Sequence, residues 1–149
     1  MKLTRIIFIL IILLLITGCQ NTGNPKGTHT KEKKIPGYNS SPDDIVEKNG
    51  DIVNKERFER FINNIEKGKN DSIRVVRYTT EGDPMLRDLE YNGETIIATS
   101  DTQEDNYGKG STNATTCTSI EVIDSTERTD YLLDGCESFI DTTILVIEK

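Results

Sequence analysis

The sequence predicts an α+β fold: a mostly antiparallel sheet with one amphipathic helix, at about residues 54–67, packed on one face and a short helix before it. Helical periodicity is confined to the first part of the domain, before residue 70. The segments that follow are rich in β-branched residues, and an Asn-Gly pair lies between two of them. Helices followed by a run of strands are typical of a sheet covered by helices on one face.

The helical part comprises two segments. The residues SPDD at 41–44 combine a capping hydroxyl, a proline and two acids, so we expect a short helix that ends at Asn49-Gly50. The second helix can begin at a capping Asn54 and end at Gly68. Its apolar residues recur at helical spacing and form one stripe that predicts a core-facing side: Phe58, Phe61, Ile62 and Ile65.

The strands follow the second helix. SIRVVRYTT at 72–80 carries apolar groups on both faces, as an inner strand does, and residues 85–91 alternate. Asn92-Gly93 then favours a type I′ hairpin, in which Leu89 would face Ile96 and Arg87 would face Ala98. Further strands are predicted at 117–124, 131–136 and 143–148, and a long acidic loop at 101–116.

Residues 1–18 have the features of a secretory leader: basic residues, then an apolar run from Ile6 to Ile16. This run is too short for a spanning helix, which needs about 20 apolar residues. ITGC at 16–19 resembles the lipobox of bacterial lipoprotein signal peptides. The resemblance implies lipidation of Cys19 and attachment to the bilayer at the extracytoplasmic face of the cell membrane. An ordinary cleaved leader with an incidental cysteine is the alternative.

The remaining chain divides by composition into two parts of opposite charge. Residues 19–40 contain almost no large apolar side chain, which predicts a flexible basic tether behind the lipidated cysteine. Residues 41–149 form a single domain with 24 acidic and 12 basic residues, a net charge of −12. Nucleic-acid binding depends on basic surface that neutralises phosphates, so the sequence disfavours it.

The three cysteines are an odd number for an exported chain. If Cys19 carries lipid, Cys117 and Cys136 remain as an even pair in an oxidising compartment, and we expect a disulfide between them. Two free thiols are the alternative. No Cys-x-x-Cys pair or neighbouring histidine suggests a metal site, and the sequence predicts neither a metal nor another cofactor.

Candidate chemistry in the predicted domain is limited to carboxylates and arginines, because the single histidine, His29, lies in the tether. Glu81 and Asp83 follow a predicted strand and could do acid-base work, although Gly-Asp-Pro is also common turn chemistry. Three arginines are expected near these acids: Arg74, Arg77 and Arg87. Ion pairing is their simplest role, and capture of an anionic ligand is the alternative. Glu81, Asp83 and Arg77 are therefore the candidate contacts to a ligand or partner.

Three stretches carry a family resemblance: IVEKNGDIVNKERFERFI at 45–62, GKNDSIRVVRYTTEGDP at 68–84 and LEYNGETI at 89–96. They are similar to small lipoproteins of Gram-positive endospore-formers, the family of domain of unknown function 4362. The similarity covers about residues 42–136. It implies a surface lipoprotein and brings no activity, substrate or site residue.

Two functions fit these observations. The first is a non-enzymatic binding module at the cell surface, whose partner is a protein, a peptide or a component of the envelope. The second is a small envelope hydrolase or transferase that uses carboxylates near Glu81 and Asp83. The absence of a recognisable catalytic set in the sequence favours the first.

Overall fold

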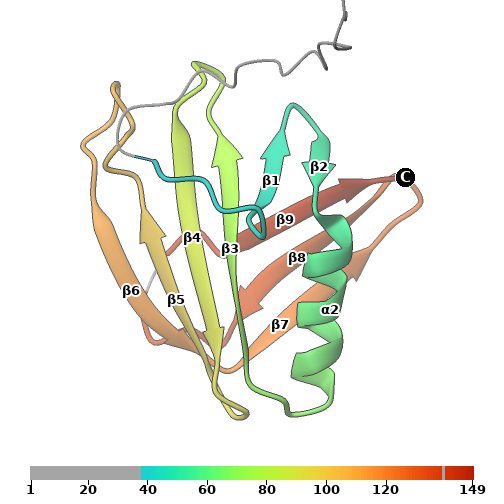
Figure 1. Ribbon diagram of the computed structural model, residues 1–149. Helices are drawn as coiled ribbons and strands as arrows, with labels where there is room; N and C mark the ends of the chain where they lie inside the picture. Colours follow the sequence, from blue (N-terminus) through green and yellow to red (C-terminus); the bar gives the residue numbers. More distant parts are fainter. Residues whose placement is uncertain (1–37, 139) are drawn as a thin grey trace, which may run out of the picture. The chain divides into compact units, whose positions relative to one another are not determined.

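The computed structural model describes residues 38–138 and 140–149, which form two β-sheets and one α-helix (Figure 1). The predicted leader, Cys19 and the tether up to residue 37 lie outside the described residues. Within the described part, no helix has the length and apolar character needed to cross a bilayer.

The larger sheet has six strands: β1 (Ile45–Lys48), β2 (Asp51–Val53), β3 (Asp71–Tyr78), β4 (Pro84–Tyr91), β5 (Ile96–Asp101) and β6 (Thr112–Cys117). Their spatial order is β2-β1-β3-β4-β5-β6. Neighbours are antiparallel except β1 and β3, which run parallel. The pair β3–β4 is therefore the centre of the sheet, and Val75 and Val76, on opposite faces of β3, are both buried.

The smaller sheet comprises β7 (Ser119–Asp124), β8 (Arg128–Asp134) and β9 (Thr143–Glu148), all antiparallel. It lies behind the larger sheet in Figure 1. Only Thr118 separates β6 from β7, so the chain passes from one sheet to the other at a sharp corner. The inner faces of the two sheets consequently face each other across one core.

The helix, α2 (Lys55–Glu66), contributes two fully buried rings to this core, Phe58 and Phe61. The Phe58 ring meets the ring of Tyr131, on β8, edge to face at a centroid distance of 4.9 Å. Each such ring stabilises the fold by roughly 1.5–3 kcal/mol through burial alone. The other buried members of the core come from both sheets: Ile45, Ile73, Val75, Leu89, Ile96, Ala98, Cys117, Leu133, Ile144 and Leu145.

The helix begins and ends where the sequence predicts, although Asn54 works differently from the expected cap. Its backbone is left-handed, with φ of 59°, and its side chain makes no capping hydrogen bond. Instead Nδ2 donates to the carbonyls of Pro42 (2.8 Å) and Asp44 (2.7 Å), which ties the helix start to the segment before β1. At the other end Gly68, with φ of 62°, donates its N–H to the carbonyl of Ile65.

The predicted α+β class is wrong, since the described residues are mostly β and form two sheets with a single short helix. The segment 41–50, predicted to be a short helix, is a turn followed by β1. The Asp44 carboxylate accepts hydrogen bonds from the Tyr38 hydroxyl and the Ser41 N–H, and this closes the turn. Ile45 and Val46 then pair with β3, so sheet formation overrides the helix-start signal.

Neither Asn-Gly pair has its predicted role. Asn49 and Gly50, expected to end a helix, are the two-residue turn of the β1–β2 hairpin, and both have positive φ, as a type I′ turn requires. Asn92 begins a four-residue loop instead, and its Oδ1 accepts the N–H groups of Glu94 and Thr95. The predicted hairpin register is therefore wrong by two residues: Leu89 pairs with Ala98, and Arg87 pairs with Ser100. Because side chains alternate with period two, the apolar face is nevertheless the predicted one.

The C-terminal strands are also divided differently from the prediction. The predicted strand at 117–124 is the end of β6 plus all of β7, interrupted by the corner at Thr118. The predicted loop at 101–116 is shorter, because β6 begins at Thr112. The strands predicted at 131–136 and 143–148 are present as β8 and β9.

Candidate functional site

The inner face of the larger sheet changes from apolar to polar along its strands. On β3 the side chains on this face are Ile73, Val75 and then Arg77. On β4, which runs the opposite way, Leu89 lies opposite Ile73, whereas Arg87 and Met85 lie opposite Val75 and Arg77. One end of the inter-sheet space is thus filled by the apolar core, and the other end is bordered by charged side chains.

A cavity of about 460 Å³ occupies this polar end. Its volume lies in the range of natural small-molecule sites, about 300–1,000 Å³. Strands β3 to β6 supply most of the lining, and the connection between β8 and β9 supplies the rest: Val75, Arg77, Met85, Leu86, Arg87, Ser100, Thr102, Asn113, Ala114, Ser138, Ile140 and Asp141. Seven of these twelve residues are polar or charged, and the other five supply apolar surface.

Arg87 is the most enclosed charge in the cavity, with only 13% of its side chain exposed. Its Nη1 donates to the Thr143 carbonyl of β9 at 2.6 Å, and its Nε donates to Ser100 Oγ at 3.2 Å. Its Nη2 lies 3.7 Å from Asp141 Oδ2, which is beyond hydrogen-bonding distance. Arg87 thus joins the two sheets and retains donor capacity on one nitrogen.

Arg77 stands on the same face, diagonally across from Arg87 in the β3–β4 register. Such diagonal neighbours are roughly 7–8 Å apart, so the two positive charges repel each other. The nearest acid to Arg77 is Glu47 on β1, at 3.6 Å from Nε to Oε2, again without a hydrogen bond. Burial lowers the pKa of Arg87; Asp141 acts in the opposite direction, and Arg77 lowers it further.

Two arginines outside the cavity, Arg74 and Arg57, have much tighter partners. Arg74, on the outer face of β3, makes two hydrogen bonds to Asp88, at 2.6 and 2.8 Å. Arg57 makes two to Asp71, at 3.1 and 2.7 Å, and one to the Ser72 carbonyl. Bidentate pairs of this kind satisfy the guanidinium fork. The two cavity arginines therefore differ from Arg74 and Arg57 in the looseness of their ion pairs.

One wall of the cavity is fixed to β6 by covalent and hydrogen bonds. Cys136 forms a disulfide with Cys117 at the end of β6, in agreement with the sequence prediction. The N–H of Glu137 donates to the Thr116 carbonyl, and the N–H of Ser138 donates to Thr115 Oγ1. These contacts position Ser138, and beyond it Ile140 and Asp141, against the cavity.

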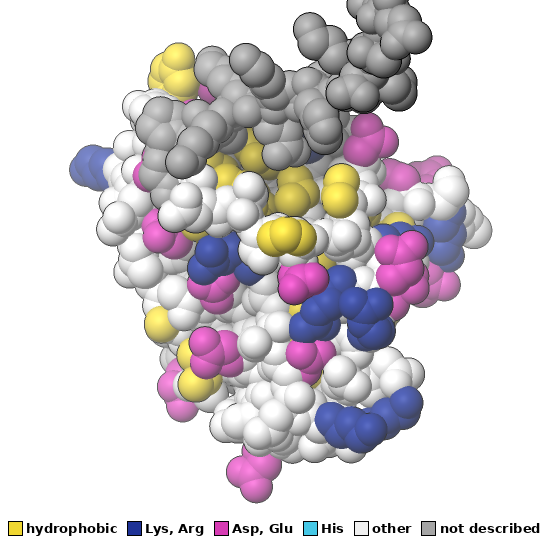
Figure 2. All heavy atoms as spheres, viewed as in Figure 1, with side chains coloured by type: hydrophobic (Ala, Val, Ile, Leu, Met, Phe, Trp, Pro, Cys, Tyr) yellow, Lys and Arg dark blue, Asp and Glu magenta, His cyan; other side chains and the backbone are white. Residues whose placement is uncertain are grey.

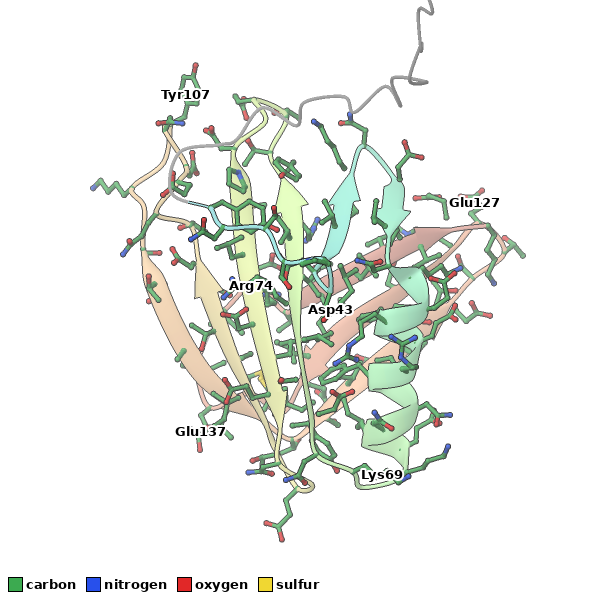
Figure 3. All side chains as sticks on the ribbon, viewed as in Figure 1. Asp43, Lys69, Arg74, Tyr107, Glu127 and Glu137 are labelled. Atoms are coloured by element: carbon green, nitrogen blue, oxygen red, sulfur yellow. A yellow bond between two sulfur atoms is a disulfide. The ribbon has the colours of Figure 1, made fainter. Side chains whose placement is uncertain are left out.

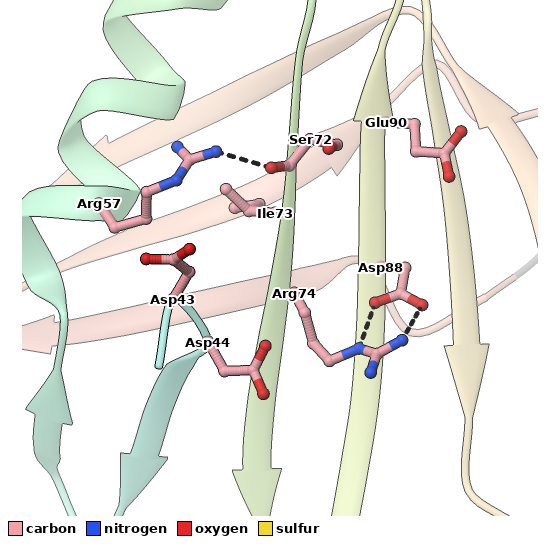
Figure 4. Close-up of a pocket in the computed structure, with 8 residues that line it drawn as sticks. All are labelled: Asp43, Asp44, Arg57, Ser72, Ile73, Arg74, Asp88 and Glu90. Atoms are coloured by element: carbon pink, nitrogen blue, oxygen red, sulfur yellow. Dashed lines mark hydrogen bonds and ion pairs between the residues drawn. The ribbon is translucent and has the colours of Figure 1, made fainter. Parts of the chain in front are cut away.

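A second hollow, of about 350 Å³, lies on the outer face of the larger sheet (Figure 4). Acidic and basic side chains alternate over this face (Figure 2), and the close-up shows Arg74 directed toward Asp88 and Arg57 toward Ser72. Beside the hollow, burial and then the hydrogen bond to Asp44 hold the pKa of Tyr38 well above its usual range. Its two arginines already form two hydrogen bonds each with an aspartate, Arg74 with Asp88 and Arg57 with Asp71, so we place the candidate site in the inter-sheet cavity instead.

The residues selected from the sequence are not brought together. Arg77 lines the cavity, whereas Glu81 and Asp83 are absent from its lining. Asp83 is buried and accepts two hydrogen bonds from Asn106, from its N–H (3.0 Å) and from Nδ2 (2.8 Å), so it anchors the loop before β6. Glu81 is exposed and accepts only from the neighbouring Thr80 hydroxyl. In the loop before β6, Tyr107 points away from the sheets into solvent (Figure 3).

Sequence reasoning missed the cavity residues other than Arg77 and Arg87, and for these two arginines it gave ion pairing as the simplest role and capture of an anionic ligand as the alternative. The available signal was the alternation of β4, where Arg87 occupies the same face as Met85 and Leu89. A cation on the core-facing side of a strand costs free energy unless it has a partner, so it marks a special position. Ser100, Asn113 and Asp141 gave no comparable signal, because only the pairing of distant strands brings them together.

Within residues 38–138 and 140–149, no group of three or more His, Cys, Asp or Glu side chains is arranged to hold a metal ion. The cavity could hold an anion through its arginines and an apolar group through Val75, Met85 and Ile140.

Comparison with known proteins gives a family and no activity. Neither a search of curated proteins nor one of solved structures found a match. A family model described as domain of unknown function (DUF4362) matches residues 42–132, which span β1 to most of β8 and supply every cavity residue except those that follow β8. The chain therefore belongs to the DUF4362 family.

Proposed function

We propose that this protein is a lipid-anchored, non-enzymatic binding protein on the extracytoplasmic face of the cell membrane, and that its ligand occupies the inter-sheet cavity. The observation that carries the binding role is the polar end of the inner face, where two loosely paired arginines border about 460 Å³ of space. A sheet interior that served packing alone would be filled with apolar side chains.

The anchor is supported by the leader and by the resemblance of ITGC at 16–19 to a lipobox. The disulfide between Cys117 and Cys136 is consistent with an oxidising compartment and leaves Cys19 as the odd cysteine. Stable attachment needs two or more acyl chains, because one chain gives only marginal membrane binding.

The positions and contacts of Glu81 and Asp83 favour binding over catalysis. Asp83 is engaged by Asn106, and Glu81 lies in an exposed turn, so neither acid lines the cavity. The only histidine, His29, precedes the described domain. The hydrolase or transferase alternative consequently has no observation of its own in its favour.

The anchor is tested by growing cells with radiolabelled palmitate. We expect label on the wild-type chain, recovered in the membrane fraction, and none on Cys19→Ser. Persistence of label on the variant, or recovery of unprocessed wild-type chain in the cytosol, would contradict the anchor.

The cavity is tested with a matched pair of variants on β5. Ser100→Phe places a ring in the cavity, and Thr99→Phe places the same ring on the opposite face of the strand. The full chain in neutral-lipid nanodiscs is screened by thermal shift against a set of small carboxylates, phosphates, amines and neutral alcohols. We expect a member that raises the Tm of wild type and Thr99→Phe and leaves Ser100→Phe unchanged. If no member does so, the cavity is not a binding site for these classes and the proposal fails.

A further inference from the structure

We infer that the cavity takes an amphipathic monoanion: an anionic head group such as a carboxylate held by Arg87 and Arg77, and an apolar portion held against Val75, Met85 and Ile140. This inference rests on the proposed function and specifies the chemical class of its ligand.

The first step in the argument is the unused donor capacity of Arg87. Two of its nitrogens donate at 2.6 and 3.2 Å, to Thr143 and Ser100, and these bonds fix the plane of the guanidinium. Its Nη2, which could donate to a bound carboxylate, has only Asp141 Oδ2 nearby, at 3.7 Å. A guanidinium held in place with an open nitrogen is a preorganised site for one carboxylate or similar anion.

The second step concerns Asp141, which occupies the place of a ligand head group without binding tightly. Its side chain is 63% exposed, in contrast to 13% for Arg87. Its Oδ1 accepts the Thr143 N–H at 3.0 Å, whereas Oδ2 makes no hydrogen bond with Arg87. The carboxylate remains largely hydrated, so replacing Oδ2 beside Arg87 costs little. A ligand anion can replace it at the open nitrogen and form the short, charge-assisted hydrogen bonds that Asp141 does not form.

The third step is the second cation. Arg77 lies on the same face, and its contact with Glu47 is longer than a hydrogen bond. Two arginines that repel each other across the β3–β4 pair are both stabilised by an anion placed between them. Arg74 and Arg57 cannot serve in this way, since each already forms two hydrogen bonds with one aspartate.

The apolar part of the ligand follows from the lining and from the charge of the domain. Val75, Met85 and Ile140 line the cavity beside the arginines. A water-sized group occupies roughly 30 Å³ in a liquid. A cavity of 460 Å³ therefore holds about 15 non-hydrogen atoms, enough for a head group and a chain of medium length. The surrounding domain is acidic, which disfavours a small inorganic anion that lacks apolar burial.

The test compares octanoate with 1-octanol, octylamine and inorganic phosphate, using the full chain in neutral-lipid nanodiscs and equilibrium dialysis. We expect octanoate to bind at least about tenfold more tightly than the other three, because hydrogen bonds to a charged group are worth a factor of about ten or more. Arg87→Gln should weaken octanoate binding by about tenfold or more. Wild type and Arg87→Gln are measured in the same nanodiscs, so the partition of the probe into lipid is equal for both and cancels in the comparison.

Two further variants separate ligand binding from folding. Arg74→Gln removes the same charge from the outer face of β3 and should leave octanoate binding within about twofold of wild type. Asp141→Asn removes the carboxylate that competes for Arg87, so it should tighten octanoate binding by about threefold. A misfolded variant cannot produce that gain.

The outcomes distinguish this inference from the proposed function. Equal binding of octanol or octylamine that is blocked by Ser100→Phe would overturn the anionic class and leave the cavity as a binding site. Equal or tighter binding of phosphate would overturn the amphipathic character. Octanoate binding unchanged in Arg87→Gln, or weakened in Asp141→Asn, would overturn the assigned role of Arg87. Absence of any cavity ligand in the thermal-shift set would remove the proposed function as well.

Discussion

At the residue scale, Arg74 and Arg87 show how the face of a strand decides the role of a side chain. Both stand on the central strands of the larger sheet and both have an aspartate nearby. Arg74, on the outer face, has a bidentate partner, and its hydrogen bonds with Asp88 raise its pKa above the usual range. Arg87 faces the inter-sheet space, where its pKa is lowered by burial. Only the second arrangement leaves a cation available to a ligand.

Asp71 is the residue whose loss we expect to be most visible in the pH dependence of stability. It accepts hydrogen bonds from Arg57 and Asn64 of α2 and from the Ser72 N–H, and so joins the helix to β3. Partial burial raises the pKa of Asp71, but these hydrogen bonds outweigh it and hold the pKa below the usual value of 3.8. Asp71→Asn should lower the free energy of unfolding by about 2 kcal/mol at pH 7, measured by urea denaturation.

The same residue gives a signed pH effect. Because the folded pKa lies below the unfolded one, the stabilisation by Asp71 is fully present above the unfolded pKa of about 3.9 and is lost as the pH falls through the folded pKa. The difference between wild type and Asp71→Asn should therefore shrink in that acidic window. Asp124→Asn, a change at an exposed ion pair with Lys149, should have a smaller effect at neutral pH. A difference that stayed constant down to pH 2 would contradict the assignment.

Two substitutions of Asn54 separate the cost of backbone strain from the cost of the lost hydrogen bonds. Its left-handed backbone suits asparagine and glycine, and its side chain holds two carbonyls of the preceding segment. Asn54→Ala should lose both advantages and cost about 2 kcal/mol, whereas Asn54→Gly keeps the backbone freedom and should cost about 1 kcal/mol. The two values are compared by thermal and urea denaturation. Equal costs would show that the left-handed backbone contributes nothing.

At the scale of elements, the sequence predicted what depends on local pattern and missed what depends on pairing. The helix at 55–66 and the strands β3, β4 and β9 follow from periodicity and from β-branched composition. The segment 41–50 has a good helix-start sequence, yet β1 gains more by pairing in parallel with β3, a contact that no local window contains.

The candidate site shows the same limit. Arg77 was selected from the sequence, but for its nearness to Glu81 and Asp83 instead of its position on the inner face. The cavity depends on β6 pairing with β5 and on the corner at Thr118, which places a second sheet over the first. Neither feature follows from alternation within a strand, because alternation fixes which face a residue takes and not what covers that face.

The disulfide is the element-scale contact with the clearest expected cost. It joins Cys117, at the end of β6, to Cys136, just after β8, at a sequence separation of 19. Replacing both cysteines, Cys117→Ala with Cys136→Ala, should lower the free energy of unfolding by about 3 kcal/mol on the chain-entropy model. Urea denaturation of wild type with and without reductant checks the assignment. A reductant effect of similar size on the double variant would contradict it.

At the scale of the whole molecule, the two sheets and the helix share one set of buried side chains. Phe58 and Phe61 of α2 pack in the same cluster as Leu89 of the larger sheet and Leu145 of the smaller one. Neither sheet has a separate buried cluster among the described residues. The domain should therefore unfold as one unit.

This cooperativity is measured by following urea denaturation with far-UV circular dichroism, which reports the strands, and with tyrosine fluorescence. We expect the two midpoints to coincide, and the heat of unfolding from calorimetry to equal the van't Hoff value. As a control, the comparison is repeated after reduction, where both midpoints should shift together. Two separated transitions would show that the smaller sheet folds independently.

The disulfide that joins the cavity wall to β6, between Cys117 and Cys136, has a consequence for where the proposed ligand would be acquired. Glutathione keeps thiols reduced in the cytosol, so a chain exported as proposed would lack this bond until it had left that compartment. Anionic metabolites of the cell interior would then have little opportunity to travel outward inside the protein. Loading would take place from the medium or the envelope, once the finished wall had formed.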